Sequence, residues 1–448
     1  MCSSSASLNL AVNACDDSAS KIQEPNGPEK GCRALALSTR YGQGLDARAV
    51  IFSLDKDVDM NLAEQPGQFA QVSAQSPVES PSQARPTLVC LSHLRWGFVY
   101  QRPQHVMSRL AKDYDVIFFE EPVLGGDEPP RLEASSPSAG IQVVVPHLPE
   151  GLDEQAMIEA QRQLLDERLA EALQGDLLLW YFTPMSLAFT DHLQAQVTVF
   201  DCMDDLSAFK GAPARLVGME RLLMNKADVV FTGGFSLWEV KQHQHGNAHP
   251  VPSSVDIGHF AQARNALADP ADQAPIARPR LGFFGVIDER FDIELVDRVA
   301  AQRPGWQIIL VGPVVKIDPQ TLPRRSNIHY LGGRQYAELP AYLSGWDVAL
   351  MPFALNASTR FISPTKTPEY LAGGCPVVST PIRDVVNGYG QSGAVFIADT
   401  TDAFVSAIEG ALRLKGTPEF LKRADAALDG MSWDNTCRFM KEQIECLR

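Results

Sequence analysis

The sequence predicts an α/β protein with two doubly wound domains that face each other across a cleft, preceded by a mostly disordered N-terminal tail. Three observations support this. The chain has 448 residues, more than the roughly 250–300 that one hydrophobic core serves. Continuous apolar strands alternate with helical segments, which is typical of a parallel sheet covered on both faces. The alternation stops near residue 272 and then starts again. We therefore predict domains at 87–272 and 273–420, with a C-terminal helical segment at 421–448 packing back across the domain interface.

Residues 1–86 are dominated by Ser, Ala, Gln, Asp, Gly and Pro, with short apolar stretches such as 48–52. Such a segment buries too little apolar surface to offset its chain entropy. We predict a disordered tail without a catalytic role. An alternative is that the start is assigned too early and that part of this segment, for instance before Met60, is not translated.

In the first domain, short apolar runs predict the strands and helical periodicity predicts the helices at 103–111 and 155–173. The expected strands are 87–91, 116–119, 141–145, 176–181, 197–200 and 227–232. In the second domain they are 281–285, 307–311, 328–331, 348–351, 375–378 and 394–397, followed by amphipathic helices at 401–414 and 433–447. Right-handed crossovers place all strand carboxyl ends of a sheet at one edge, where ligands of such sheets bind.

Composition and charge exclude several classes of protein. The formal net charge is −15 and no stretch concentrates Lys or Arg, so nucleic acid is a poor candidate partner. No apolar run approaches the roughly 20 residues of a membrane span, and the N-terminus lacks the pattern of a secretory signal. Eight cysteines occur without a C-x-x-C pair, so we assign neither a metal site nor disulfides. We expect a cytoplasmic protein, with contact at the inner face of the cytoplasmic membrane left open.

A candidate phosphate site lies at residues 363–369. Ser363 followed by Pro364 predicts a helix start, whose free N–H groups and positive dipole end favour an anion. Lys366 would add a full charge one turn into this helix, and Glu369 could accept from the two hydroxyls of a ribose. Thr367 with Pro368 is an equally good helix start. A plain alternative is a capped helix in which Lys366 and Glu369 form a solvated pair.

A second strand–loop element supports the same site. Gly285 lets the chain turn after the strand at 281–285, and Arg290 precedes the next helical segment. A guanidinium in that place can clamp phosphate oxygens. The alternative is that Arg290 pairs with Asp288 or Asp292 at the surface.

These elements, in this order, resemble the C-terminal half of GT-B-fold glycosyltransferases, in particular the retaining nucleotide-sugar enzymes that include sucrose synthases and bacterial polysaccharide mannosyltransferases. The resemblance extends from residue 87 to the C-terminus and is strongest at 281–378. The motifs that carry it are VPSSVDIGHF at 251–260, LVGP at 310–313, IHYLGG at 328–333, WDVALMP at 346–352 and YLAGGCPVV at 370–378.

The resemblance implies two Rossmann-like domains and a UDP- or GDP-linked sugar as co-substrate, with no further cofactor. It implies that Arg290 and Lys366 act on the donor diphosphate and that Asp201 and Asp204, at a strand end of the first domain, orient sugar or acceptor hydroxyls. Further donor contacts implied by the family pattern are Gly97, Gly285, Gly312, Gly333, Arg334, Ser363, Pro364, Thr365 and Glu369.

The reaction that follows from the resemblance is metal-independent transfer of a hexose, with retention, to a glycan or lipid-linked acceptor in bacterial surface-polysaccharide synthesis. One residue departs from the family pattern: Phe361 stands where the first of two glutamates separated by seven residues is usual. The alternatives are therefore a catalytically impaired nucleotide-sugar binding protein and a nucleotide-sugar epimerase of the same fold. A nicotinamide dehydrogenase is disfavoured, because no G-x-G-x-x-G follows the first strand of either domain.

Overall fold

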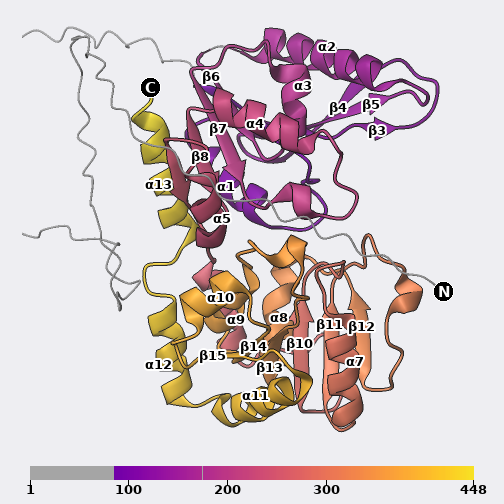
Figure 1. The fold of residues 1–448 in the computed structure, drawn as a ribbon, viewed down its shortest axis with the longest axis vertical. Helices are drawn as coiled ribbons and strands as arrows, with labels where there is room; N and C mark the ends of the chain where they lie inside the picture. The colour runs from indigo at the N-terminus through magenta and orange to yellow at the C-terminus, as the bar shows by residue number, and fades with distance from the viewer. Residues whose placement is uncertain (1–84, 174) are drawn as a thin grey trace, which may run out of the picture. The chain divides into compact units, whose positions relative to one another are not determined.

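The computed structural model describes residues 85–173 and 175–448. These residues fold into two α/β domains, each built on its own sheet (Figure 1). The predicted tail at 1–86 lies outside the described residues except for its last two positions. The two Rossmann-like sheets confirm the fold class predicted from the alternation of strands and helices.

The first sheet has the strand order β3-β5-β2-β1-β6-β7-β8-β9, and β4 pairs antiparallel with β5. Its central strands are buried along their whole length, as the apolar runs predicted. Three strands were not predicted: β4 is mostly exposed and polar, and β3 and β9 are very short. The strands are β1 (Thr87–Ser92), β2 (Asp115–Glu120), β3 (Val123–Leu124), β4 (Arg131–Ser138), β5 (Ile141–Leu148), β6 (Leu177–Tyr181), β7 (Val197–Cys202), β8 (Val229–Thr232) and β9 (Ala248–Pro250).

The helices of the first domain connect these strands. The longest begins after Asp153, whose carboxylate accepts from the backbone N–H of Ala156 and so satisfies a free donor of the first turn. The helices are α1 (Arg102–Leu110), α2 (Glu154–Ala172), α3 (Leu187–Thr190), α4 (Leu216–Lys226) and α5 (Phe235–Lys241).

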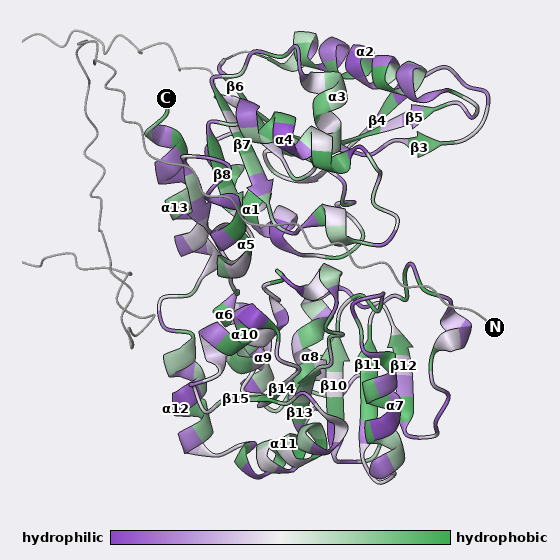
Figure 2. Cartoon of the chain, viewed as in Figure 1, coloured by the Kyte–Doolittle hydropathy of each residue, from purple (hydrophilic) through white to green (hydrophobic). Residues whose placement is uncertain are grey.

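The second sheet is wholly parallel, with the order β12-β11-β10-β13-β14-β15. The chain reverses its direction of winding between β10 and β13, which makes the carboxyl ends of β10 and its neighbours the expected ligand position. The strands are largely hydrophobic and the helices mixed (Figure 2). The strands are β10 (Arg280–Phe284), β11 (Gln307–Val311), β12 (Ile328–Gly332), β13 (Val348–Met351), β14 (Val377–Ser379) and β15 (Val395–Ile397).

The helices that follow the first sheet contribute residues to the hydrophobic cores of both domains. Val255 and Phe260 belong to the core of the second sheet, although the predicted boundary at 272/273 assigns them to the first domain. Helix α13 (Trp433–Glu445) places Trp433 and Met440 in the core of the first sheet. The other helices are α6 (Ile257–Ala261), α7 (Ile293–Gln302), α8 (Leu339–Ser344), α9 (Lys366–Ala372), α10 (Arg383–Tyr389), α11 (Thr401–Leu414) and α12 (Pro418–Ala427).

Candidate functional site

Two glycines form the floor of the candidate site at the carboxyl ends of β10 and β11. Gly285 has a φ of 139° and Gly312 a φ of 153°, a region that side-chain-bearing residues rarely adopt. A Cβ on Gly312 would lie 1.8 Å from the carbonyl oxygen of Gly285. The predicted turn after the strand at 281–285 is therefore present, and the two strand ends approach each other more closely than any side chain would allow.

Lys366 lies over Gly285. A Cβ on Gly285 would be 2.2 Å from Cε of Lys366 and 2.9 Å from its Nζ. The ammonium is 5.8 Å from the ring centre of Phe283. Among the residues that the structure describes, no carboxylate lies within ion-pair distance of Nζ. Burial lowers the pKa of Lys366 against the opposing charge of Glu369, and the nearby charge of Arg290 lowers it further.

Arg290 is held on two sides. Its Nε donates to both carboxylate oxygens of Asp288 (3.0 and 3.1 Å) and its Nη2 donates to Oδ2 (2.6 Å). Its guanidinium carbon is 5.1 Å from the ring centre of Phe209, which belongs to the first domain. Burial opposes the charged form, but the hydrogen bonds to Asp288 outweigh it and raise the pKa of Arg290. The alternative pairing with Asp288 is thus present, while Asp292 caps α7.

Asp204 brings the first domain to these cations. It lies two residues after β7 and is partly exposed. Burial raises its pKa, whereas the positive charges of Arg290 and Lys366 act in the opposite direction. Glu369 is buried, and this burial raises its pKa to about 8 against the opposing charge of Lys366. The structure therefore brings together four of the predicted site residues: Asp204, Arg290, Lys366 and Glu369.

Asp201 is not part of this group, and its predicted contact with a sugar or acceptor is corrected here. The carboxylate is fully buried and lies 2.8 Å from Nη2 of Arg102, whose Nε donates to both of its oxygens. Arg102 is itself buried and donates to the backbone carbonyl of Val251 (2.7 Å). This ion pair is buried in the interior of the first domain, so neither side chain is available to a ligand.

The helix start in the phosphate-site segment also differs from both predictions. Helix α9 begins at Lys366 with Thr365 as its N-cap residue, so Lys366 is the first helical residue and not one turn in. Pro368 is tolerated because N–H groups of a first turn have no intrahelical partner. Ser363, Pro364 and Thr365 form a partly exposed segment before the helix. With only seven residues, α9 contributes little dipole, and the charge of Lys366 dominates.

The remaining predicted positions lie in loops. Gly333 is exposed beside Arg334, whose Nε donates to Oη of Tyr342 (2.6 Å) and whose Nη2 pairs with Asp272. The loop that carries the predicted donor contacts Gly333 and Arg334 is therefore held by these two contacts. Gly97 is exposed after β1, with no other atom within 4 Å of an added Cβ.

Sequence reasoning missed Phe209. Its ring is also 5.4 Å from Nζ of Lys316, so two cations of the second domain share one aromatic ring of the first. It follows a short 3-10 turn, Leu206–Ala208, in an irregular segment. No periodicity or motif marks such a position.

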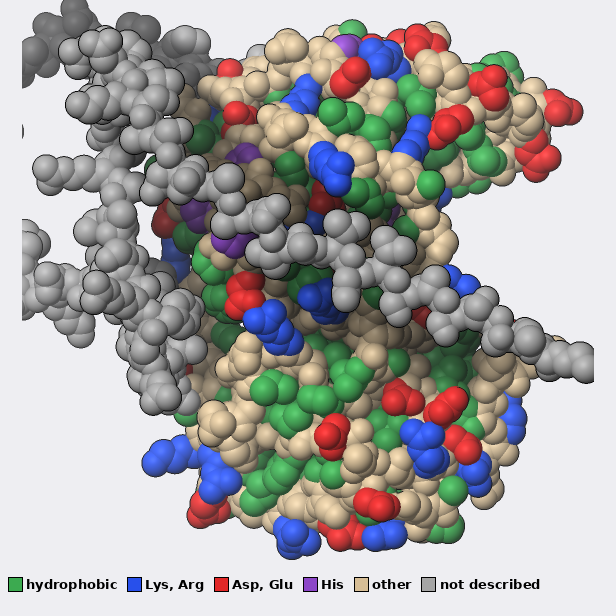
Figure 3. All heavy atoms as spheres, viewed as in Figure 1, with side chains coloured by type: hydrophobic (Ala, Val, Ile, Leu, Met, Phe, Trp, Pro, Cys, Tyr) green, Lys and Arg blue, Asp and Glu red, His purple; other side chains and the backbone are tan. Residues whose placement is uncertain are grey.

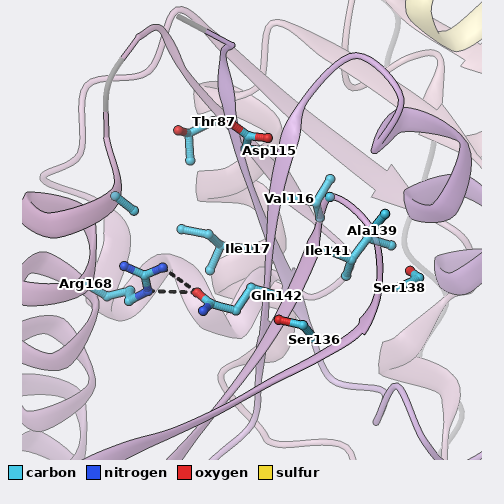
Figure 4. Close-up of a pocket in the computed structure, with 12 residues that line it drawn as sticks. Thr87, Asp115, Val116, Ile117, Ser136, Ser138, Ala139, Ile141, Gln142 and Arg168 are labelled. Atoms are coloured by element: carbon cyan, nitrogen blue, oxygen red, sulfur yellow. Dashed lines mark hydrogen bonds between the residues drawn. The ribbon is translucent and has the colours of Figure 1, made fainter.

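Other surfaces of the molecule lie apart from this group. On the face shown in Figure 3, Lys and Arg side chains are scattered among acidic ones. A cavity of about 420 Å³ lies at the amino ends of β1 and β2, lined by Thr87 and Asp115, the edge opposite to the candidate site (Figure 4). There Arg168 donates to Oε1 of Gln142 (2.9 and 2.5 Å). No helix within the described residues is long and apolar enough to cross a membrane.

Comparison with known proteins shows which proteins this chain resembles. Residues 278–413 match the family model for glycosyl transferases group 1. A protein of Bacillus subtilis (strain 168), whose name describes a teichuronic acid biosynthesis glycosyltransferase, TuaH, is 25% identical over 238 residues. The match spans 48% of this chain and 59% of that relative's length.

Solved structures share the fold over most of the chain. Sucrose-phosphate synthase from Thermosynechococcus elongatus has a TM-score of 0.61 at 15% identity, covering 81% of this chain and 99% of its own. An E. coli trehalose-6-phosphate protein bound with UDP-2-fluoro glucose has a TM-score of 0.58 at 13% identity, covering 80% and 99%. Anabaena HepE in complex with UDP has a TM-score of 0.56 at 13% identity, covering 81% and 100%.

The two sheets share the fold of the solved glycosyltransferases of the GT-B type. Residues 278–413 match the glycosyl transferases group 1 model, and the three comparisons together support a glycosyltransferase of the GT-B type. The resemblance to GT-B glycosyltransferases drawn from the motifs at 281–378 is confirmed, whereas the retaining mechanism stays a prediction.

Proposed function

We propose that the protein transfers a hexose from a UDP- or GDP-linked sugar to a glycan or lipid-linked acceptor, with retention of configuration and without a metal. The UDP complexes among the structural neighbours support the donor class. The teichuronic acid relative supports a role in bacterial surface-polysaccharide synthesis. The location we propose is the cytoplasm or the inner face of the cytoplasmic membrane. The observation that carries the proposal is the ammonium of Lys366, seated over Gly285 without a carboxylate partner among the described residues.

The chemical requirement of this reaction is charge stabilisation. As the bond from the sugar C1 to the diphosphate breaks, negative charge grows on the departing oxygens, and fixed cations stabilise it without rearranging. Lys366 has the larger role because Arg290 is partly neutralised by Asp288. Arg290 remains oriented by that same carboxylate and by Phe209, so it presents its charge in a defined direction.

Retention follows if the acceptor oxygen bonds to C1 on the face that the diphosphate leaves. In this scheme the acceptor proton passes to an oxygen of the departing phosphate. Asp204 orients a sugar or acceptor hydroxyl beside the two cations. Glu369 holds the ribose, and the loop of Gly333 and Arg334 faces the base.

Alanine variants of Lys366 and Arg290 test the proposal. We expect each to lower the transfer rate by about 10²–10³-fold, as losses of transition-state charge stabilisation do, with a larger loss for Lys366→Ala. Lys422→Ala, an exposed lysine on α12, is the matched control and should transfer normally. Donors are found first by thermal shift against UDP-, GDP- and ADP-sugars, since ligand at a hundredfold its Kd stabilises by about 2.7 kcal/mol. Wild-type rates in both site variants would exclude the proposal, and loss of transfer in EDTA would exclude metal independence.

A second function, nucleotide-sugar binding without transfer, is favoured by Phe361. Its side chain packs against the core of the first domain and lies 4.9 Å from the guanidinium of Arg360. A packing contact thus stands where the family pattern has a carboxylate. Binding of a nucleotide sugar without transfer or hydrolysis would support this reading. Inversion of the donor sugar without any acceptor would instead indicate an epimerase.

A further inference from the structure

Helix α5 of the first domain receives its N-terminal cap from the second domain. Its N-cap residue is Gly234, which has no side chain to accept from the first turn. Instead Oδ1 of Asp384, on α10, accepts from the backbone N–H of Ser236 at 3.0 Å. Asp384 is 8% exposed, so the contact is shielded from water. A capping bond of this kind stabilises a helix end, because it satisfies a backbone N–H that has no partner within the helix.

The fit at Gly234 is steric. Its φ of −170° is extended backbone that any residue adopts, so conformation does not require glycine there. The available space does require glycine, because an added Cβ would lie 2.1 Å from Oδ2 of Asp384 and 2.7 Å from Cβ of Ser363. The missing side chain is what allows the two domains to approach at this point.

The preceding residue contacts the other half of the candidate site. The N–H of Gly233 donates to the carbonyl of Cys202 at 2.9 Å. A Cβ on Gly233 would lie 1.9 Å from the carbonyl oxygen of Met203, the neighbour of Asp204. The turn of Gly233 and Gly234 thus packs between two segments: Met203, which precedes Asp204, and Ser363, which precedes Lys366 by three residues.

We propose that Asp384 is a positioning residue: by capping α5 across the domain junction, it sets the spacing between Asp204 of the first domain and Lys366 of the second. Asp384 does not touch the proposed substrate and acts through Gly234 and its neighbours. The inference rests on the proposed function for its catalytic consequence, but the cap itself is a property of the folded chain.

A neighbouring contact provides a matched control. Arg383, next to Asp384, pairs with Glu239 of α5 at 2.5 Å, and both side chains are about half exposed. Exposed ion pairs contribute little to stability, because water and salt screen them. Arg383→Ala therefore removes a bond between the same two helices without removing the buried cap.

The test compares Asp384→Ala, Asp384→Asn and Arg383→Ala for transfer and for binding of the free nucleoside diphosphate. A displacement of about 1 Å in a reacting group can cost on the order of 10²-fold. We expect Asp384→Ala to lower kcat by about 10–100-fold while nucleotide affinity changes less than about 3-fold, because the nucleotide contacts proposed above, Arg290, Lys366 and Glu369, all lie in the second domain. Asp384→Asn should restore most of the rate, since its amide oxygen accepts the same bond. Arg383→Ala should behave as wild type.

A double-mutant cycle with Gly234→Ala sharpens the test. The added methyl collides with Asp384, so Gly234→Ala should lower kcat in the wild-type background and cost less in Asp384→Ala. Additive effects of the two changes would overturn the proposal. So would a wild-type kcat in Asp384→Ala, or an equal defect in the Asn and Ala variants.

Hydrogen exchange separates this inference from the proposed function. Exchange of the α5 peptide, residues 235–241, should accelerate in Asp384→Ala and not in Arg383→Ala, and it needs no activity. If wild type transfers no sugar, the proposed function fails and the cap is judged by exchange alone. Unchanged exchange in Asp384→Ala overturns the cap whatever the activity.

Discussion

The side chain of Lys366 occupies the space in which a side chain of residue 285 would begin, with its Cε 2.2 Å from the Cβ position of Gly285. The glycine thus serves two needs at once: a φ of 139° at the end of β10 and room for an ammonium above it. The end of β10 and the side chain of Lys366 are therefore packed directly against each other. Changing the glycine must disturb the lysine.

Gly285→Ala is accordingly expected to weaken donor binding by at least 10-fold and to lower the free energy of unfolding by about 1–3 kcal/mol, the cost of a side chain in this backbone region. Urea denaturation and titration with the donor measure the two effects. Gly305→Ala is the control, because Gly305 is exposed and an added Cβ meets no other atom within 4 Å. Normal donor affinity in Gly285→Ala would show that Gly285 does not contribute to donor binding.

The buried pair of Arg102 and Asp201 predicts a different kind of defect. Asp201→Ala should lower the free energy of unfolding by about 3–5 kcal/mol, because it leaves the guanidinium of Arg102 buried without its partner. The double variant Arg102→Ala with Asp201→Ala should lose less than the sum of the single changes. Denaturation curves test this. If Asp201→Ala kept its stability but lost transfer activity, Asp201 would have a catalytic role after all.

The contrast between Asp201 and Asp204 shows the limit of sequence reasoning here. Both follow the same apolar run, and the predicted strand end at residue 200 treated them alike. Strand β7 continues to Cys202, so Asp201 lies inside the sheet and faces Arg102, whereas Asp204 lies beyond it. Apolar periodicity finds a strand, but its last residues are decided by partners distant in the chain.

The same holds for the other differences. Ser363 followed by Pro364 is a good local helix start, yet α9 begins two residues later, at Lys366. The sheets, the glycine at 285 and the grouping of Arg290 with Lys366 followed from local patterns and from the resemblance. The cap that Asp384 gives to α5 joins residues 148 positions apart, and no local pattern signals it.

Glu369 predicts a pH dependence of stability. Burial raises its pKa from about 4.5 to about 8 in the folded protein, so between these values the folded state keeps a proton that the unfolded chain releases. The free energy of unfolding should therefore fall as pH rises from about 5 to 8, by at most about 1.4 kcal/mol per pH unit from this group. Glu369→Gln removes the titrating group, so its denaturation curves should lack this part of the slope. Equal slopes in the two proteins would show that Glu369 is ionised throughout.

Phe209 tests how the first domain orients Arg290. Its ring lies 5.1 Å from the guanidinium of Arg290 and 5.4 Å from the ammonium of Lys316, which is exposed. Cation–π contacts contribute about 0.5–1 kcal/mol at exposed sites and about 2 kcal/mol when desolvated. Asp288 fixes Arg290 from its own loop, so loss of the ring should loosen the guanidinium without freeing it. We expect Phe209→Ala to raise the KM for the donor about 3- to 10-fold, with a small change in the free energy of unfolding.

Two further substitutions separate the electrostatic contribution of the ring from its bulk. Phe209→Tyr keeps a π face and should resemble wild type, whereas Phe209→Leu keeps most of the apolar volume but has no face to attract a cation. If the leucine variant shows the same rise in KM as Phe209→Ala, the ring orients Arg290 through its charge distribution. A leucine variant with wild-type kinetics would mean that Phe209 only fills space, and that Asp288 alone holds Arg290 in the position proposed for the departing diphosphate.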